Sequence, residues 1–282
     1  MVSCTSYLKL GKVIMNKKNH ILTQERFWFN HLNGNSLRIN EADIYYEEYG
    51  DKDAEPLIFL HGGFGNIEDF NIILSSFSKK YRLIGIDSRG HGKSTLGTTQ
   101  LSYELIQKDI ECILNFLKIR TCSILGFSDG GIVGYKLASH CPERVRKLIT
   151  IGAEWCSGEV KKMQEIFSKI TGASWKSKFP ADYQAYQRLN PDPDFDLLAK
   201  SIVTMWLNTG SSSYPNDQVK NITCQVLAMR GVNDHLVSSA KFSELQEIIS
   251  NIKLFEIPNA GHAAFIDQKD ICFEEIINFL EL

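Results

Sequence analysis

The chain has 282 residues, and 43% of them are hydrophobic, which is enough to bury a sizeable core. Its formal net charge of −2 gives no basic field that would attract nucleic acid or an anionic membrane. No apolar run approaches the roughly 18 residues that a transmembrane helix needs. These properties favour a globular protein and exclude the classes that depend on a basic or membrane-inserted surface.

Seven cysteines occur along the chain, and their spacings match no zinc-binding pattern. Cys122 and Cys224 lie in apolar runs, where a free thiol behaves as a small hydrophobic side chain. Because reduced thiols are typical of the cytoplasm, we expect a cytoplasmic protein.

The first 35 residues are interpreted as an N-terminal extension. Lys9 and Lys12 interrupt its only apolar stretch, and no small-residue cleavage site follows, so we expect no signal peptide. Met15, followed by Asn-Lys-Lys, would make a plausible start, so one interpretation is that residues 1–14 of this extension are not native.

From about residue 36 the chain alternates between β-like and helical segments. The stretch 37–49 predicts an antiparallel hairpin at a sheet edge, because two short β-like runs flank Asn40-Glu41-Ala42. Short runs that are apolar on both faces then predict buried strands of a parallel sheet. In chain order the predicted segments are a strand at 56–60, a helix at 66–79, a strand at 83–86, a helix at 102–119, a strand at 123–125, a helix at 130–140 and a strand at 147–151.

Residues 156–216 break this alternation, since they contain no buried-strand run. We predict about three helices there, bounded by four prolines, namely Pro180, Pro191, Pro193 and Pro215. The alternation resumes with a strand at 225–229, a helix at 238–250, a strand at 253–257 and a helix at 268–281. The predicted fold is therefore α/β, with a mainly parallel sheet covered on both faces by helices. Its core comprises residues 36–155 and 217–282, and residues 156–216 form a helical cap, or lid.

The segment Gly126-Phe127-Ser128-Asp129-Gly130 carries the pattern G-x-S-x-G between a predicted strand and a predicted helix. A sharp turn at such a junction lifts the serine above the sheet edge, and the flanking glycines avoid side-chain clashes. The letters alone also fit an ordinary glycine-rich turn. The position at the junction favours Ser128 as a nucleophile.

A serine nucleophile needs a base and an acid that orients the base. His262 follows the last predicted strand, and Asp234 follows the strand at 225–229. Taken alone, each also fits a solvated loop residue or a turn that caps a helix. However, α/β folds place their chemistry at the carboxyl ends of strands. The order Ser128, Asp234, His262 therefore predicts a catalytic triad.

Acyl transfer also needs backbone donors for the developing oxyanion. The N–H of Asp129, directly after the nucleophile, is one candidate. The loop after the strand at 56–60 offers Gly63 or Phe64 as the other, and its glycines allow close approach of the backbone. His61 and His91 are interpreted as buried hydrogen-bonding residues rather than catalysts.

Five motifs in this order resemble those of the α/β-hydrolase superfamily from about residue 36 to the end. They are His61-Gly62-Gly63, Asp87-x-Arg89-Gly90-His91-Gly92-x-Ser94, the elbow at 126–130, Gly231-x-x-Asp234 and Gly261-His262. The resemblance implies the α/β-hydrolase fold, with residues 156–216 as its cap insertion.

The elbow and the two residues after it are similar to the biphenyl-hydrolase-like (valacyclovir hydrolase) group, whose enzymes cleave amino-acid esters. That resemblance implies that Asp129 receives a substrate ammonium. The alternative is that Asp129 only stabilises the first turn of its helix. Phe64 stands where proline iminopeptidases and carbon–carbon bond hydrolases often carry proline, which weakens both of those interpretations.

Aromatic side chains near the cap and the elbow are predicted to line the substrate pocket beside Asp129. The candidates are Phe127, Trp155, Trp175 and Trp206. The alternative is that most of them hold the cap helices to the body.

The sequence thus predicts a serine hydrolase that cleaves a small carboxylic ester through an acyl-enzyme, with no cofactor and no metal. An α-amino-acid ester is one option for the substrate. A thioesterase, a carbon–carbon bond hydrolase, a proline iminopeptidase-like enzyme, a perhydrolase and a hydrolase-fold ligand receptor remain open alternatives. The expected partner is a small-molecule substrate, with no nucleic acid and no membrane, and the expected state is a monomer or homodimer.

Overall fold

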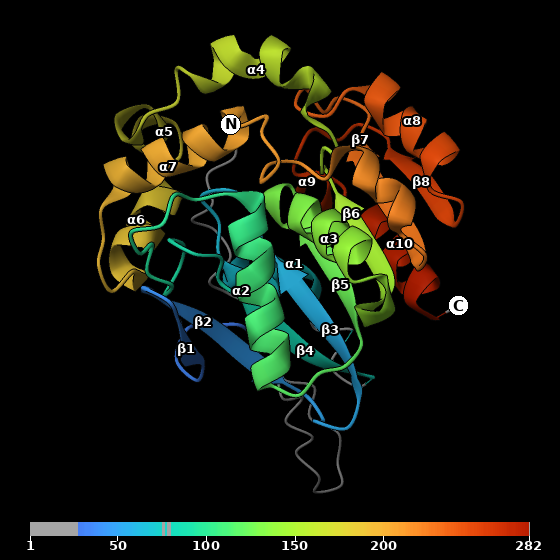
Figure 1. Cartoon of the computed structure of the whole chain (residues 1–282), viewed down its shortest axis with the longest axis horizontal. Helices are drawn as coiled ribbons and strands as arrows, with labels where there is room; N and C mark the ends of the chain where they lie inside the picture. Colours follow the sequence, from blue (N-terminus) through green and yellow to red (C-terminus); the bar gives the residue numbers. More distant parts are fainter. Residues whose placement is uncertain (1–27, 75–76, 78–79, 282) are drawn as a thin grey trace, which may run out of the picture.

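The computed structural model describes residues 28–74, 77 and 80–281 (Figure 1). Most of the predicted N-terminal extension, including Met15, lies outside these residues. The part that is described lies against the body of the protein. Phe29 is buried beneath the sheet, and His31 is buried beside the loop that follows strand β4.

In the described part of the chain, eight strands form one central sheet in the order β1-β2-β4-β3-β5-β6-β7-β8. The β1–β2 and β2–β4 pairs are antiparallel, and all the other pairs are parallel. The predicted mainly parallel sheet with an antiparallel edge hairpin is thereby confirmed. The strands are β1 (Asn35–Ile39), β2 (Ala42–Tyr49), β3 (Glu55–Leu60), β4 (Tyr81–Ile86), β5 (Cys122–Phe127), β6 (Val145–Ile151), β7 (Gln225–Gly231) and β8 (Ile252–Ile257).

Helices cover both faces of the sheet, because the central strands are apolar on both sides. One face packs against α2, α3 and α8, and the other packs against α1, α9 and α10. The helices outside residues 156–216 are α1 (Asn71–Leu74), α2 (Tyr103–Phe116), α3 (Asp129–His140), α8 (Ser239–Ile248), α9 (Ala264–Asp267) and α10 (Lys269–Glu281). Short 3₁₀-helices are η1 (Ile67–Phe70), η2 (Pro142–Arg144), η3 (Ser157–Glu159) and η4 (Asn216–Asn221).

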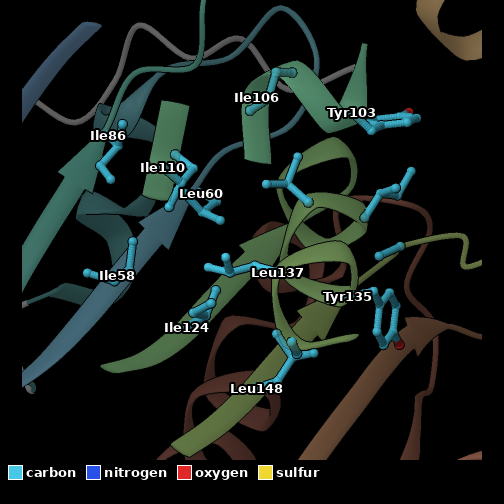
Figure 2. Close-up of a cluster of buried hydrophobic side chains, with 14 of the residues drawn as sticks. Ile58, Leu60, Ile86, Tyr103, Ile106, Ile110, Ile124, Tyr135, Leu137 and Leu148 are labelled. Atoms are coloured by element: carbon cyan, nitrogen blue, oxygen red, sulfur yellow. The ribbon is translucent and has the colours of Figure 1, made fainter. Parts of the chain in front are cut away.

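The core between the sheet and helices α2 and α3 is built mainly from branched aliphatic side chains, together with Tyr103 and Tyr135 (Figure 2). Ile58 and Ile124, on neighbouring parallel strands, stand opposite each other in register. Burial of each such side chain contributes roughly 1.5–3 kcal/mol. This packing fixes the end of β5 and the start of α3, and the candidate nucleophile lies between them.

The sequence predicted one helix at 66–79, whereas the structure has η1 followed by the single turn of α1. Asn66 begins η1 with a capping box, in which its side chain accepts from the backbone and the Asp69 carboxylate accepts from the N–H of Asn66. A backbone hydrogen bond from Phe77 to Leu74 then forms a turn. The remainder of the predicted helix lies partly outside the described residues.

Residues 156–216, hereafter the cap segment, contain four helices rather than the predicted three: α4 (Val160–Phe167), α5 (Gly172–Lys178), α6 (Pro180–Leu189) and α7 (Phe195–Leu207). Pro180 does not separate a helix from a loop, because it is the first residue of α6 and Phe179 caps both α5 and α6. Figure 1 shows these four helices grouped beyond the carboxyl end of β3.

Within the described residues, no helix is both long enough and apolar enough to cross a membrane. Six of the seven cysteines lie in the described part of the chain, and all six are free thiols. The expected cytoplasmic compartment stays a prediction.

Candidate active site

Ser128 occupies the sharp turn between β5 and α3. Its backbone has φ 50° and ψ −119°, a strained conformation for a residue other than glycine. A Cβ atom at Gly126 would overlap the carbonyl oxygen of Gly130, and one at Gly130 would overlap that of Leu60. The two glycines of the predicted elbow are therefore required by close backbone approach on both sides of the serine.

His262 lies between Ser128 and Asp234. Its Nε2 is 3.0 Å from Ser128 Oγ, and its Nδ1 is 3.0 Å from Asp234 Oδ2. Since a carboxylate only accepts, Nδ1 carries the proton and donates to Asp234, which leaves Nε2 free to accept from the serine hydroxyl. The three residues predicted from separate strand ends thus form one chain of hydrogen bonds.

Asp234 is held in position by the loop that follows β7. Its Oδ1 accepts from the backbone N–H groups of Leu236 at 2.8 Å and Val237 at 3.3 Å. Burial alone would raise the pKa of this carboxyl. The hydrogen bond and charge of His262, together with the two backbone donors, leave the pKa below its usual value. Asp234 therefore stays ionised and can stabilise an imidazolium at His262.

The backbone loop at 61–64 runs directly beside the serine. A Cβ atom at Gly62 would lie 3.1 Å from Ser128 Cβ, and one at Gly63 would lie 2.8 Å from Asp129 Oδ2. Within the described residues, the backbone N–H groups of Gly63, Phe64 and Asp129 have no hydrogen-bond partner. These are the three groups predicted to form the oxyanion hole, and that role stays a prediction.

Phe64 has φ 61°, which is unusual for a bulky side chain. Its ring is buried, stacks on Trp175 at a centroid distance of 3.9 Å and meets Trp206 edge-on at 5.9 Å. The candidate oxyanion loop is therefore attached to the cap segment through this side chain.

The Asp129 carboxylate is buried and accepts from two side-chain donors, one of which is shared between its two oxygens. Tyr103 Oη donates to Oδ1 at 2.7 Å, and Trp206 Nε1 lies 2.8 Å from Oδ1 and 2.9 Å from Oδ2. Burial raises the pKa of this carboxyl despite the stabilising donors. Asp129 thus joins helix α2 of the core to helix α7 of the cap segment.

The four predicted pocket aromatics occupy different positions. Phe127 packs its ring against His262 at a centroid distance of 5.3 Å. Trp175 and Trp206 line a cavity in the cap segment. Trp155 instead donates its indole N–H to the carbonyl of Lys241, and it lines neither cavity next to His262.

Two cavities meet at the hydrogen-bonded chain. The serine cavity, of about 60 Å³, is lined by Ser128 and His262 and by three carboxylates, Asp129, Glu154 and Glu159. The cap cavity, of about 370 Å³, is lined mainly by apolar side chains of the cap segment and also reaches His262. Trp206, Phe167 and Leu236 line both cavities.

Glu154 was missed in the sequence analysis. It follows β6 as Asp234 follows β7, so the strand-end rule that identified Asp234 could also have indicated Glu154. No G-x-S-x-G or Gly-His pattern marks it, which is why the motifs gave no signal.

His61 and His91 are buried and serve the loop after β4, as expected. His61 Nδ1 donates to its neighbour's carbonyl oxygen at 2.7 Å, and its Nε2 accepts from the N–H of Ser88 at 2.9 Å. Burial lowers the pKa of both rings, to about 3 for His91. From the cap segment, Asn190 donates to the carbonyl oxygens of this loop at 2.9–3.4 Å.

Comparison with known proteins agrees with this architecture. Residues 55–172 match the family model described as the alpha/beta hydrolase fold. The chain is 25% identical to the zebrafish (Danio rerio) sn-1-specific diacylglycerol lipase over 267 residues, which cover 85% of this chain and 83% of the relative. It is 23% identical to the esterase YbfF of Escherichia coli K12 over 242 residues, which cover 80% of this chain and 92% of that relative.

The crystal structure of a hydrolase from Pseudomonas aeruginosa superposes with a TM-score of 0.73 at 19% identity, covering 90% of this chain and 100% of that one. The likeness of the elbow to the biphenyl-hydrolase-like group stays a prediction. The family model matched over residues 55–172, the hydrolase relatives and the shared fold together support an enzyme of the hydrolase class with the α/β-hydrolase fold.

Proposed function

We propose that the chain is a carboxylic ester hydrolase that works through an acyl-enzyme on Ser128. The observation that carries the proposal is the continuous set of hydrogen bonds from Ser128 through His262 to Asp234, at 3.0 Å each. Relatives described as an esterase and a diacylglycerol lipase support ester cleavage.

In the first half of the reaction, Ser128 Oγ attacks the ester carbonyl carbon while its proton moves to His262 Nε2. The oxyanion accepts hydrogen bonds from the N–H of Asp129 and from the Gly63–Phe64 loop. His262 then returns the proton to the leaving alkoxide, which departs as an alcohol.

In the second half, His262 removes a proton from water, and the hydroxide attacks the acyl carbon. Collapse of that intermediate releases the carboxylic acid and returns the proton to Ser128. Asp234 stabilises the imidazolium in both halves. Every step uses side-chain and backbone groups of the chain itself, so the proposal needs no cofactor.

The two cavities suggest how an ester is oriented. The acyl group is the part that becomes bonded to Ser128, and Ser128 lines only the small serine cavity. We therefore assign a short acyl group to the serine cavity and an apolar alcohol group to the larger cap cavity.

The test is hydrolysis of p-nitrophenyl esters with acyl chains of two to ten carbons, together with fluorophosphonate labelling. We expect turnover that favours the shortest chains and covalent labelling at Ser128. Ser128→Ala should abolish labelling and lower kcat by at least about 10³-fold. A wild-type protein that neither turns over any of these esters nor reacts with the probe would contradict the proposal.

A further inference from the structure

Three carboxylates line the serine cavity, and no lysine or arginine lies among the described residues that line it. Such a cavity favours a positively charged or hydrogen-bond-donating group. The question is which of the three carboxylates is available to receive it.

Two of the three are already engaged. Both oxygens of Asp129 accept from Trp206, and Oδ1 also accepts from Tyr103. Both oxygens of Glu159 accept from the ammonium of Lys162, at 2.9 and 3.1 Å.

Glu154 differs from both. Its Oε1 accepts from the backbone N–H of Trp155 at 2.9 Å and from that of Cys156 at 3.4 Å. Its Oε2 is buried and has no hydrogen-bond partner among the described residues. A buried carboxylate oxygen without a donor is costly, and native structures usually supply that donor from the protein, an ordered water or a ligand.

We propose that Glu154 is a specificity-determining residue that receives an ammonium group carried by the acyl part of the substrate. The preferred substrates are then short amino-acyl esters with an apolar alcohol. The inference rests on the proposed function, because it takes Ser128 to be the acylated residue.

The charge balance of the cavity favours an ammonium over a neutral hydroxyl donor. Burial raises the pKa of Glu154 to about 7, with the backbone donors acting in the opposite direction. An ammonium beside Oε2 would supply both the missing donor and the countercharge, and would favour the ionised carboxylate. A neutral hydroxyl would supply only the donor.

Glu154 thereby replaces Asp129 as the residue expected to recognise an amine. The sequence pointed to Asp129, and its role as an amine receptor stays a prediction. The Asp129 carboxylate, however, accepts from Tyr103 of α2 and from Trp206 of α7. Glu154 Oε2, by contrast, has no donor among the described residues.

The experiment compares the hydrolysis of ethyl 2-aminobutanoate with that of ethyl butanoate at pH 7.5. Hydrolysis is monitored through the acid that it releases. The readout is the ratio of kcat/KM for the amino ester to that for the neutral ester. We expect the wild-type ratio to exceed one by about 10- to 100-fold, the range of a charge-assisted hydrogen bond, and Glu154→Gln to bring it close to one. The matched control Glu165→Gln, at an exposed position of α4 outside both cavities, should keep the wild-type ratio.

Three results would overturn the inference: a wild-type ratio near one, an unchanged ratio in Glu154→Gln, or loss of the ratio in Asp129→Asn alone. The last result would assign the role to Asp129.

A binding measurement separates this inference from the proposed function. Calorimetry with n-butylammonium and with n-butanol should show ammonium binding to the Ser128→Ala protein. It should also show at least about tenfold weaker ammonium binding when Glu154→Gln is added. If ester turnover fails while Glu154→Gln still weakens ammonium binding, only the proposed ester hydrolysis is rejected. If Ser128→Ala and Ser128→Ala/Glu154→Gln bind the ammonium equally, the Glu154 site is rejected.

Discussion

Asp234 illustrates how one carboxylate sets the protonation of the whole site. It accepts from His262 Nδ1 with one oxygen and from two backbone N–H groups with the other. In Asp234→Asn the amide oxygen can keep the backbone bonds, but the amide NH₂ then faces Nδ1. The imidazole would take the wrong tautomer, with its Nε2 protonated and unable to accept from Ser128.

We therefore expect Asp234→Asn to lower kcat by about 10³- to 10⁴-fold at neutral pH, with little change in unfolding midpoint. Ester hydrolysis and thermal unfolding would be measured on the same preparation. Asp217→Asn, at an exposed position in η4, is the matched control and should behave as wild type. Equal activity of the two variants would show that Asp234 does not orient the base.

At the scale of single residues, the sequence predicted the candidate triad but not Glu154. Ser128, Asp234 and His262 stand in patterns whose spacing reflects the local backbone, so the patterns can be recognised without coordinates. The importance of Glu154 depends on which neighbours bind its two oxygens. That information arises only when β6, the cap segment and α3 come together.

At the scale of elements, the junction between α7 and the body is made by Asp129 and Trp206. Removing the indole N–H in Trp206→Phe would leave Tyr103 as the only side-chain donor to the buried carboxylate among the described residues. We expect this to cost about 1–3 kcal/mol in the free energy of unfolding, measured by urea titration. Trp155→Phe is the control, because its indole N–H donates to a neutral carbonyl and its loss should cost less.

An equal loss of stability in the two variants would indicate that the hydrogen bond between Trp206 and Asp129 stabilises the fold no more than the one between Trp155 and Lys241. Trp206 also lines both cavities, so its replacement should change KM for esters as well.

The elements themselves were predictable to different degrees. The central strands are apolar on both faces, a pattern typical of strands inside a parallel sheet. The cap helices are short and half-exposed, and prolines mark their ends ambiguously: Pro180 begins a helix directly after another one ends. The stretch after Asn66 has helical periodicity, yet its described residues form the short 3₁₀-helix η1 and the single turn of α1 rather than one long helix.

At the scale of the whole molecule, a buried ion cluster fastens the segment around residue 31 to the body. His31 Nδ1 lies 2.7 Å from Glu68 Oε1, and its Nε2 lies 2.8 Å from Asp87 Oδ2. Asp87 also accepts from the backbone N–H groups of Ile67 and Lys93. Three segments far apart in sequence are thus joined, and no sequence pattern indicated that His31 takes part.

The His31 cluster makes stability depend on pH in a defined direction. Burial alone would lower the pKa of His31, but the hydrogen bonds and charges of Asp87 and Glu68 raise it from 6.5 to about 9. The folded state therefore holds this proton more tightly than the unfolded state does. The resulting stabilisation is complete below pH 6.5 and is lost as the pH rises through 9, with a size of about 3 kcal/mol.

Urea unfolding at pH 6 and pH 9.5 would measure this loss for the wild type and for His31→Gln. Burial also raises the pKa of Asp69 and Glu154 to about 7, so their ionisation lowers stability over part of the same range. Those contributions are common to both proteins and cancel in the difference. The stability gap between wild type and His31→Gln should therefore be large at pH 6 and shrink by pH 9.5, and a gap that stays constant would mean that folding does not raise the pKa of His31.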